Sequence, residues 1–275
     1  MSLTIQQKTN ANGFPKSGEL IEISGAGALE ATDRILLNSL YQIAHESGQM
    51  TTPNARWSVP ISSLKSTHVG NERLRESLSR LLKVEVNVSY QDENGTDMIL
   101  QTHLFEFFAS PRGNNGPQGN ELKFGFPEML REILARSGRW GRIRAEVVCA
   151  MTSKFAIALY ELIQLRTGLK HRAFVDIPID RFRDLLGVPE GKLLRGPDFR
   201  RFCLEPAILE VNGLSDYGVK VDLIRAHARA PASEVRIAWW KKEGDEFRAA
   251  YRERQMSKVG RLARLKGQTE NVFDN

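Results

Sequence analysis

Two groups of basic residues have the chemistry and spacing needed to bind an anionic polymer. The first group surrounds the start of a helix that we expect over residues 197–211, and it consists of Lys192, Arg195, Arg200 and Arg201. A guanidinium group can donate two hydrogen bonds to the O6 and N7 atoms of guanine, and a helix N-terminus favours phosphate. Arg200 and Arg201 are therefore the candidates for base contacts. The alternative is that all four form a solvated face.

The second group lies on an earlier helix, expected over residues 72–82. Its members are Asn71, Arg73, Arg75, Arg80 and Lys83. Asparagine and arginine side chains are suited to the edges of bases, but Glu72 and Glu76 lower the positive charge of this helix. The sequence leaves open whether this group contacts bases or only the phosphate backbone.

Other kinds of chemistry find no support in the sequence. The segment from Gly187 to Lys192 comes closest to a phosphate-binding P-loop, but it has one residue too few between its glycines, and Leu193 stands where a hydroxyl would bind magnesium. Cys149 and Cys203 form no C-x-x-C pair and the histidines are single, so we expect free buried thiols and no zinc. We therefore expect no catalytic residues, no metal, no cofactor and no enzymatic activity.

The composition is typical of a soluble protein of two domains. The 275 residues suffice for two domains of roughly 100–150 residues each. The fractions of hydrophobic residues (41%) and charged residues (26%) are those of a globular chain, which excludes a disordered one. We expect a cytoplasmic location, because no apolar run approaches the roughly 18 residues of a membrane span and the polar N-terminus lacks the core of a secretory signal. The net charge of +6 favours an acidic partner.

Hydrophobic periodicity predicts a flexible arm and then a first unit of helices and strands. The arm, residues 1–28, is rich in Asn, Gly, Ser and Pro. The unit should contain a helix over 29–48, a strand over 57–60, helices over 61–66 and 72–82, a hairpin of strands 84–88 and 98–110 turning at Asp92–Gly95, a strand over 122–126 and a helix from Pro127. This is the order of elements in a winged helix-turn-helix.

The same order returns in the second half. Ser153 should cap a helix that runs to Arg166. After it we expect a strand over 174–179, a short helix ending at 186–187, the helix over 197–211, and strands over 219–227 and 234–240. Within the helix over 197–211, Phe199, Phe202 and Leu209 are assigned to the core, and Pro206 should kink the helix. The expected fold class is α+β, with two tandem winged-helix domains over 29–138 and 139–245.

Two further basic segments each have two interpretations. A cluster lies where the domains should join, and it either follows phosphates or only solvates the linker; its members are Arg131, Arg136, Arg139, Arg142 and Arg144. The C-terminal tail, residues 246–275, carries seven Arg and Lys residues against Glu253 alone between positions 248 and 266, which gives +6 (seven minus one). The tail is either a basic arm that orders on DNA or a solvated helix.

Segments of the second half resemble the Rep_3 family of plasmid replication initiators. They are SKFAIALYEL at 153–162, FVDIP at 174–178, FRDLLG at 182–187, DFRR at 198–201 and LEPAILEVN at 204–212. The family usually ends the last segment with Glu-Ile-Asn, and Val211 replaces the isoleucine here. The resemblance covers roughly residues 29–241, is specific in the second domain, and rests on the order of elements in the first. The Gly- and Asn-rich loop at 113–120 departs from the family pattern.

The resemblance implies a function in starting DNA replication. Members of the family bind repeated origin sequences (iterons) in double-stranded DNA through two winged helices, help to melt adjacent DNA, and recruit the host initiator and helicase. In many members a homodimer represses its own promoter. The alternative is a tandem winged-helix transcriptional regulator, which a lone palindrome in a promoter would favour over an array of direct repeats. A nicking relaxase is a third interpretation, although no paired-histidine cluster occurs.

Overall fold

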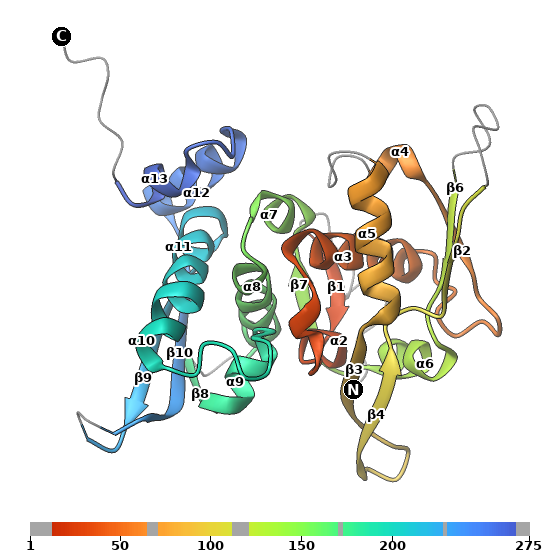
Figure 1. Ribbon diagram of the computed structural model, residues 1–275, viewed down its shortest axis with the longest axis horizontal. Coiled ribbons are helices and arrows are strands. Elements are labelled where there is room, and N and C mark those ends of the chain that lie inside the picture. The colour runs from red at the N-terminus through yellow and green to blue at the C-terminus, as the bar shows by residue number, and fades with distance from the viewer. Residues whose placement is uncertain (1–12, 65–70, 112–120, 170–172, 228–229, 268–275) are drawn as a thin grey trace.

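The computed structural model describes residues 13–64, 71–111, 121–169, 173–227 and 230–267. Figure 1 shows two halves side by side, with α7 and α8 between them. The elements of the first half are β1 (Phe14–Ser17), α2 (Gly18–Ile21), η1 (Ala26–Ala28), α3 (Ala31–Glu46), β2 (Trp57–Pro60), α4 (Ile61–Leu64), α5 (Asn71–Lys83), β3 (Glu85–Gln91), β4 (Asp97–His103), β5 (Phe107–Ala109), β6 (Glu121–Gly125), α6 (Glu128–Arg136) and β7 (Trp140–Ile143).

The second half repeats the order of three helices and a hairpin. Its elements are α7 (Ala145–Ala150), α8 (Lys154–Arg166), β8 (Phe174–Pro178), α9 (Ile179–Leu185), α10 (Gly196–Phe199), the π-helical segment η2 (Arg200–Leu204), α11 (Glu205–Leu214), β9 (Tyr217–Arg225), β10 (Ala232–Lys241), α12 (Gly244–Gln255) and α13 (Arg261–Leu265). α10, η2 and α11 follow one another without a break and form a single helix over 196–214, which we call the reading helix. The predicted helix over 197–211 is confirmed.

All strand pairs of the described residues are antiparallel. The second half has one sheet in the order β8-β10-β9, and β9 and β10 form its hairpin wing. The first half has the hairpin β3–β4 and a separate sheet in the order β2-β6-β5, while β1 pairs with β7. In Figure 1 the tips of the two hairpins point in the same direction, toward the bottom of the view.

Helix α8 lies between the two halves, packs against both, and is buried on every side. Residues 156–164 are all buried, including the polar side chains of Glu161 and Gln164. The helix packs against α3, α2 and β7 of the first half and against α11 of the second. Its start is held twice: the hydroxyl of Ser153 accepts a hydrogen bond from the Ala156 N–H, as predicted, and the Glu210 carboxylate of α11 accepts the N–H groups of Thr152 and Ser153.

The prediction of a flexible arm is wrong for residues 14–28. β1 pairs with β7 over four residues, and Phe14 and Leu20 are buried in the core. Lys16, which falls within the predicted arm, is 1% exposed, and its ammonium group lies 2.8 Å from a carboxylate oxygen of Glu161. Burial lowers the pKa of Lys16, and the charge of Glu161 opposes that shift. Residues 1–12 of the predicted arm lie outside the described residues.

The strand expected over 98–110 is in fact two strands in different sheets. β4 pairs with β3 up to His103, and β5 pairs with β6. Between them Leu104 and Phe105 are both fully buried, which neighbouring residues of one pleated strand cannot be when only one face is covered. Phe105 packs against the rings of Phe108, Phe124 and Phe126. The chain therefore leaves the hairpin to fill this aromatic core.

Replacing Lys16 by methionine should destabilise the fold, because the buried carboxylate of Glu161 then loses the ammonium group that it binds directly and keeps the amide of Asn38 and the attraction of the buried Arg34. Losing one partner of a buried ion pair costs about 3–5 kcal/mol, whereas replacing both partners by apolar residues is often neutral. We expect the free energy of unfolding in urea to fall by about 3 kcal/mol in Lys16→Met and to recover in part in Lys16→Met/Glu161→Leu, where the buried Arg34 also loses the attraction of Glu161. A single variant as stable as the wild type would show that the pair does not hold β1 in place.

Candidate nucleic-acid interface

The reading helix is positioned by its buried face and by the loop before it. Phe199, Cys203, Ala207 and Val211 are buried against the domain core. The preceding loop turns at Gly187 and Gly191, and at Leu193, all with positive φ. Arg183 of α9 connects this loop to the helix, because its guanidinium lies 4.7 Å from the centre of the Phe199 ring and donates a hydrogen bond to the carbonyl of Lys192.

The structure places the predicted basic residues of this domain on the surface around the start of the reading helix. Lys192 and Arg195 lie in the loop, and Arg200 and Arg201 lie one turn into the helix, all exposed. Arg195 has only a loose ion pair with Asp198 at 3.8 Å. The other three form no ion pair with any residue that the structure describes. These cations are thus available to an external anion.

The reading helix contains a π turn where the two arginines lie. The N–H of Glu205 donates to the carbonyl of Arg200, five residues earlier, instead of four. Pro206, which has no N–H to give to the carbonyl of Phe202, follows directly. The predicted distortion at Pro206 therefore takes the form of a π turn rather than a break, and such turns are frequent at functional sites.

The assignment of Phe202 to the core is wrong. Its side chain is 54% exposed, whereas Phe199 is 1% exposed, and Leu209 is partly buried. In an α-helix, residues three apart share a face, but a π turn rotates less per residue, so the residue three positions later falls further short of a full turn and points further away from the first. Phe202 lies beside Arg201, whose guanidinium is 5.2 Å from the centre of the phenyl ring.

The wing contributes a cation that sequence reasoning did not single out. Arg225 is exposed at the end of β9, and its guanidinium lies 3.7 Å from the position that a Cβ atom would take on Gly196, the first residue of α10. Its Nη1 atom also donates to the carbonyl of Ala230 across the wing. Arg225 therefore lies beside the N-terminus of the reading helix, a proximity between residues 29 positions apart that no local pattern would reveal.

In the first domain, the predicted residues of α5 divide into two kinds. Arg73, Arg75 and Lys83 are exposed, and none forms an ion pair with a described residue. Nothing is described of the side chain of Asn71. Arg80 instead donates two hydrogen bonds to Asp33, at 2.7 and 3.0 Å, and these bonds raise the pKa of Arg80. Because Asp33 is fully buried in α3, Arg80 anchors α5 to α3.

The arginine cluster at the domain junction is largely structural, which neither interpretation of it anticipated. Arg131 is 3% exposed and donates to the carbonyls of Met50 and Thr52. Three more members form ion pairs with carboxylates: Arg136 with Glu93, Arg139 with Glu22, and Arg144 with Glu146. Arg142 is exposed. Four of the five arginines are therefore bound to other segments of the chain, three of them within the first half.

Much of the C-terminal basic segment is folded against the second domain. Glu253 accepts hydrogen bonds from Arg264 and Arg261, which lower the pKa of its carboxyl. Arg261, 3% exposed, also donates to the carbonyl of Ala150, and Arg254 donates to that of Leu214. Over residues 244–267 the segment is thus helical and attached to the second domain by these contacts, while most of its residues, Arg248 and Arg252 among them, are exposed. Whether it binds DNA stays a prediction. Residues 268–275 lie outside the described part of the chain.

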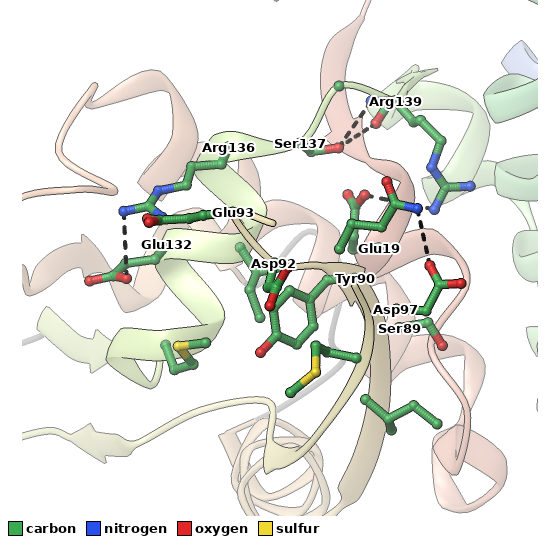
Figure 2. Close-up of a pocket in the computed structure, with 16 residues that line it drawn as sticks. Glu19, Ser89, Tyr90, Asp92, Glu93, Asp97, Glu132, Arg136, Ser137 and Arg139 are labelled. Carbon is green, nitrogen blue, oxygen red and sulfur yellow. Dashed lines mark hydrogen bonds and ion pairs between the residues drawn. The ribbon is translucent and has the colours of Figure 1, made fainter. Parts of the chain in front are cut away.

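A pocket of about 1140 Å³ between the β3–β4 hairpin and α6 has the wrong charge for nucleic acid. Figure 2 shows its polar lining, which comprises the carboxylates of Glu19, Asp92, Glu93, Asp97 and Glu132 and the guanidinium groups of Arg136 and Arg139. Arg136 is held by Glu93 at 3.0 Å. Because five carboxylates outnumber two arginines, this pocket repels phosphate, and we do not place the interface here.

Among the described residues, no group of three or more His, Cys, Asp or Glu side chains is arranged to hold a metal ion. Both cysteines are free; Cys203 is buried, as predicted, and Cys149 is partly buried. Burial raises the pKa of the Cys203 thiol to about 12, so it is not a thiolate nucleophile near neutral pH. None of the described helices is long and apolar enough to cross a membrane.

Comparisons with known proteins agree with the order of elements. The profile of the family described as "Initiator Replication protein, WH1" matches residues 15–164, and that of "Initiator Rep protein, WH2" matches residues 178–232. The predicted fold class of two tandem winged helices is thereby confirmed. The predicted domain boundaries stay predictions. No curated protein matches the chain.

A solved structure is similar across most of the chain. It is titled "Crystal structure of Pi initiator protein in complex with iteron DNA", and it superposes with a TM-score of 0.60 at 14% sequence identity. The match covers 86% of this chain and all of the other. At this identity the likeness shows a shared fold.

Replacing Arg80 by alanine should destabilise the protein, because the buried carboxylate of Asp33 loses its charged partner. The side chain of Arg80 is 29% exposed, so solvent screens part of the loss, and we expect a decrease of about 2 kcal/mol in the free energy of unfolding. The matched control on the same helix is Arg73→Ala, which should change stability by less than about 0.5 kcal/mol. Equal stability of the two variants in urea titrations would return Arg80 to the group of free cations.

Proposed function

The chain belongs to the Rep_3 family of initiator replication proteins, and from this premise we propose that it is a plasmid replication initiator that binds iterons in double-stranded DNA. The observation that carries the proposal is the pair of exposed arginines, Arg200 and Arg201, on the outer face of the reading helix, where no described carboxylate neutralises them. The similarity to the Pi initiator solved with iteron DNA supports it at the level of the fold.

In the proposed complex the reading helix enters the major groove, as the third helix of a winged helix does. Arg200 and Arg201 donate hydrogen bonds to guanine edges, which discriminates against other bases by about 1–3 kcal/mol per bidentate contact. Lys192, Arg195 and Arg225 contact phosphates, which hold the helix in register without reading sequence. The wing and the loop before the helix thus position the two reading arginines.

The first winged helix provides a second contact with the duplex. Arg73, Arg75 and Lys83 form the exposed cationic face of α5, and Asn71, at the start of the same helix, is included on its residue type alone. We leave Arg80 out of this set, because Asp33 binds it. Two domains on one duplex lengthen the site that is read, which suits direct repeats of about two turns of DNA.

Further steps follow from family membership. We propose that the bound protein helps to melt adjacent origin DNA and recruits the host initiator and helicase, that a homodimer represses the gene, and that the protein acts in the cytoplasm without cutting phosphodiester bonds. The second candidate, a tandem winged-helix regulator, shares the same DNA interface. A plasmid that carries the origin and replicates only when this gene is intact would separate the initiator from the regulator.

The double substitution Arg200→Ala/Arg201→Ala should abolish preferential binding to the DNA repeats that flank the gene. Losing two base contacts predicts at least a tenfold weaker specific complex. The measurement is a gel shift with repeat-bearing and scrambled duplexes at several salt concentrations, where each phosphate contact contributes about −0.9 to the slope of log K against log salt.

The control for this experiment is Arg136→Ala/Arg248→Ala, which removes the same charge from exposed positions away from the reading helix, 63% and 71% exposed. It should leave discrimination between the two duplexes intact. Equal and weak binding of the wild type to both duplexes would contradict the proposed function. A loss of discrimination that is the same in both double variants would show that only net charge matters.

A further inference from the structure

Phe202 is an exposed aromatic side chain that the domain core does not use. The core beneath the reading helix is filled by Phe199, whose ring lies 6.5 Å from that of Phe182 in an edge-to-face arrangement, and by Cys203 and Leu204. Phe202 keeps 54% of its surface exposed, more than any other phenylalanine among the described residues. Since packing does not account for it, the side chain is available to a ligand.

The position of Phe202 places it on the edge of the exposed cationic face. Arg200, Arg201 and Phe202 are consecutive exposed residues of the π-helical segment, so Phe202 directly follows the two arginines of that face. Arg201 holds its guanidinium 5.2 Å from the centre of the Phe202 ring. An apolar protein partner would have to bury these arginines, whereas a polyanion would be attracted by them. The surroundings therefore favour DNA over a protein as the ligand of this ring.

The major groove offers an exposed methyl group for such a ring. Thymine alone presents a C5-methyl group there, and phenylalanine is one of the side chains that contact it. A ring stacked near a guanidinium that bonds guanine would reach the neighbouring base pair. Arg201 and Phe202 both lie in the π turn over 200–204 and both are exposed, so the arginine and the phenyl ring can face the groove together.

We propose that Phe202 is a specificity-determining residue that contacts the C5-methyl group of a thymine next to the base pair read by Arg201. The proposal rests on the proposed function, because it requires the reading helix to lie in the major groove. It goes further by adding an apolar contact to the hydrogen bonds of the arginines. The preferred sequence should then contain a thymine whose methyl group contributes to affinity.

The test combines methyl deletion in the DNA with ring deletion in the protein. The preferred duplex is first selected from randomised DNA with the wild-type chain, and each thymine is then replaced by deoxyuridine, which removes only the methyl group. At one or two positions the wild type should bind about fourfold more weakly, the effect of exposing one buried methyl-sized group. In Phe202→Ala that loss should disappear at the same positions.

The control is Phe174→Ala in β8, a phenylalanine that is 48% exposed and also carries a guanidinium, that of Arg236, over its ring. This variant should keep the wild-type response to deoxyuridine, and thermal denaturation should show all three proteins folded. Specific binding with the same deoxyuridine losses in wild type and Phe202→Ala would overturn this inference and leave the proposed function intact. A wild type without any preferred sequence would overturn both.

Discussion

The arrangement of the two domains depends on the hydrogen bonds that the buried carboxylate of Glu161 accepts. This carboxylate lies on α8, accepts the ammonium group of Lys16 from β1 at 2.8 Å, and accepts the amide of Asn38 from α3 at 2.6 Å. Charges in such surroundings are costly unless they are paired, so β1, α3 and α8 adopt their positions together. At its N-terminus the same helix is capped by Glu210 of the reading helix. The reading helix and the first domain are therefore fixed to a common element, and a continuous core runs through both halves. This rigidity matters for a protein with two winged helices, because the separation of the segments that it reads on DNA is a geometric property of the protein.

Pairing, rather than net charge, distinguishes the cations that can bind DNA from those that hold the fold. The chain has 39 Arg and Lys residues, and many of its arginines end on carboxylates or on backbone carbonyls. Arg131 and Arg261 are almost fully buried and act as cross-links between segments far apart in the sequence. The arginines of the acidic pocket between the β3–β4 hairpin and α6 are paired as well, since both form ion pairs with carboxylates of the pocket lining (Figure 2). The exposed cations around the start of the reading helix, Lys192, Arg200 and Arg201, have no such partners among the described residues, so an anion binds most favourably on this surface.

The order of elements could be predicted from the sequence because it is encoded locally. The apolar spacing of α3 and α5, the serine cap of α8 and the Asn-Gly turn of the first hairpin are all short-range signals, and each element lies where it was expected. The errors concern contacts between distant residues. The predicted flexible arm included Lys16, which the fold pairs with Glu161, 145 residues later. Counting charges in the C-terminal segment cannot reveal that Glu253 gathers two arginines from the next helix. At the candidate site the sequence identified four cations of the second domain, but it could not reveal that Asp33 binds Arg80 in the first, and it overlooked Arg225.

The reading helix is also where the chain departs most from local rules. Its preceding loop holds Leu193 at a φ of 51°, in the left-handed region that non-glycine residues rarely adopt, and the helix itself accommodates a proline by forming a π turn. Such local conflicts cost stability and persist where a function requires them. The helical periodicity that assigned Phe202 to the core failed at this turn, since the turn rotates the residues before Pro206 relative to those after it. The same distortion that defeats the pattern places an arginine and a phenyl ring on one exposed face.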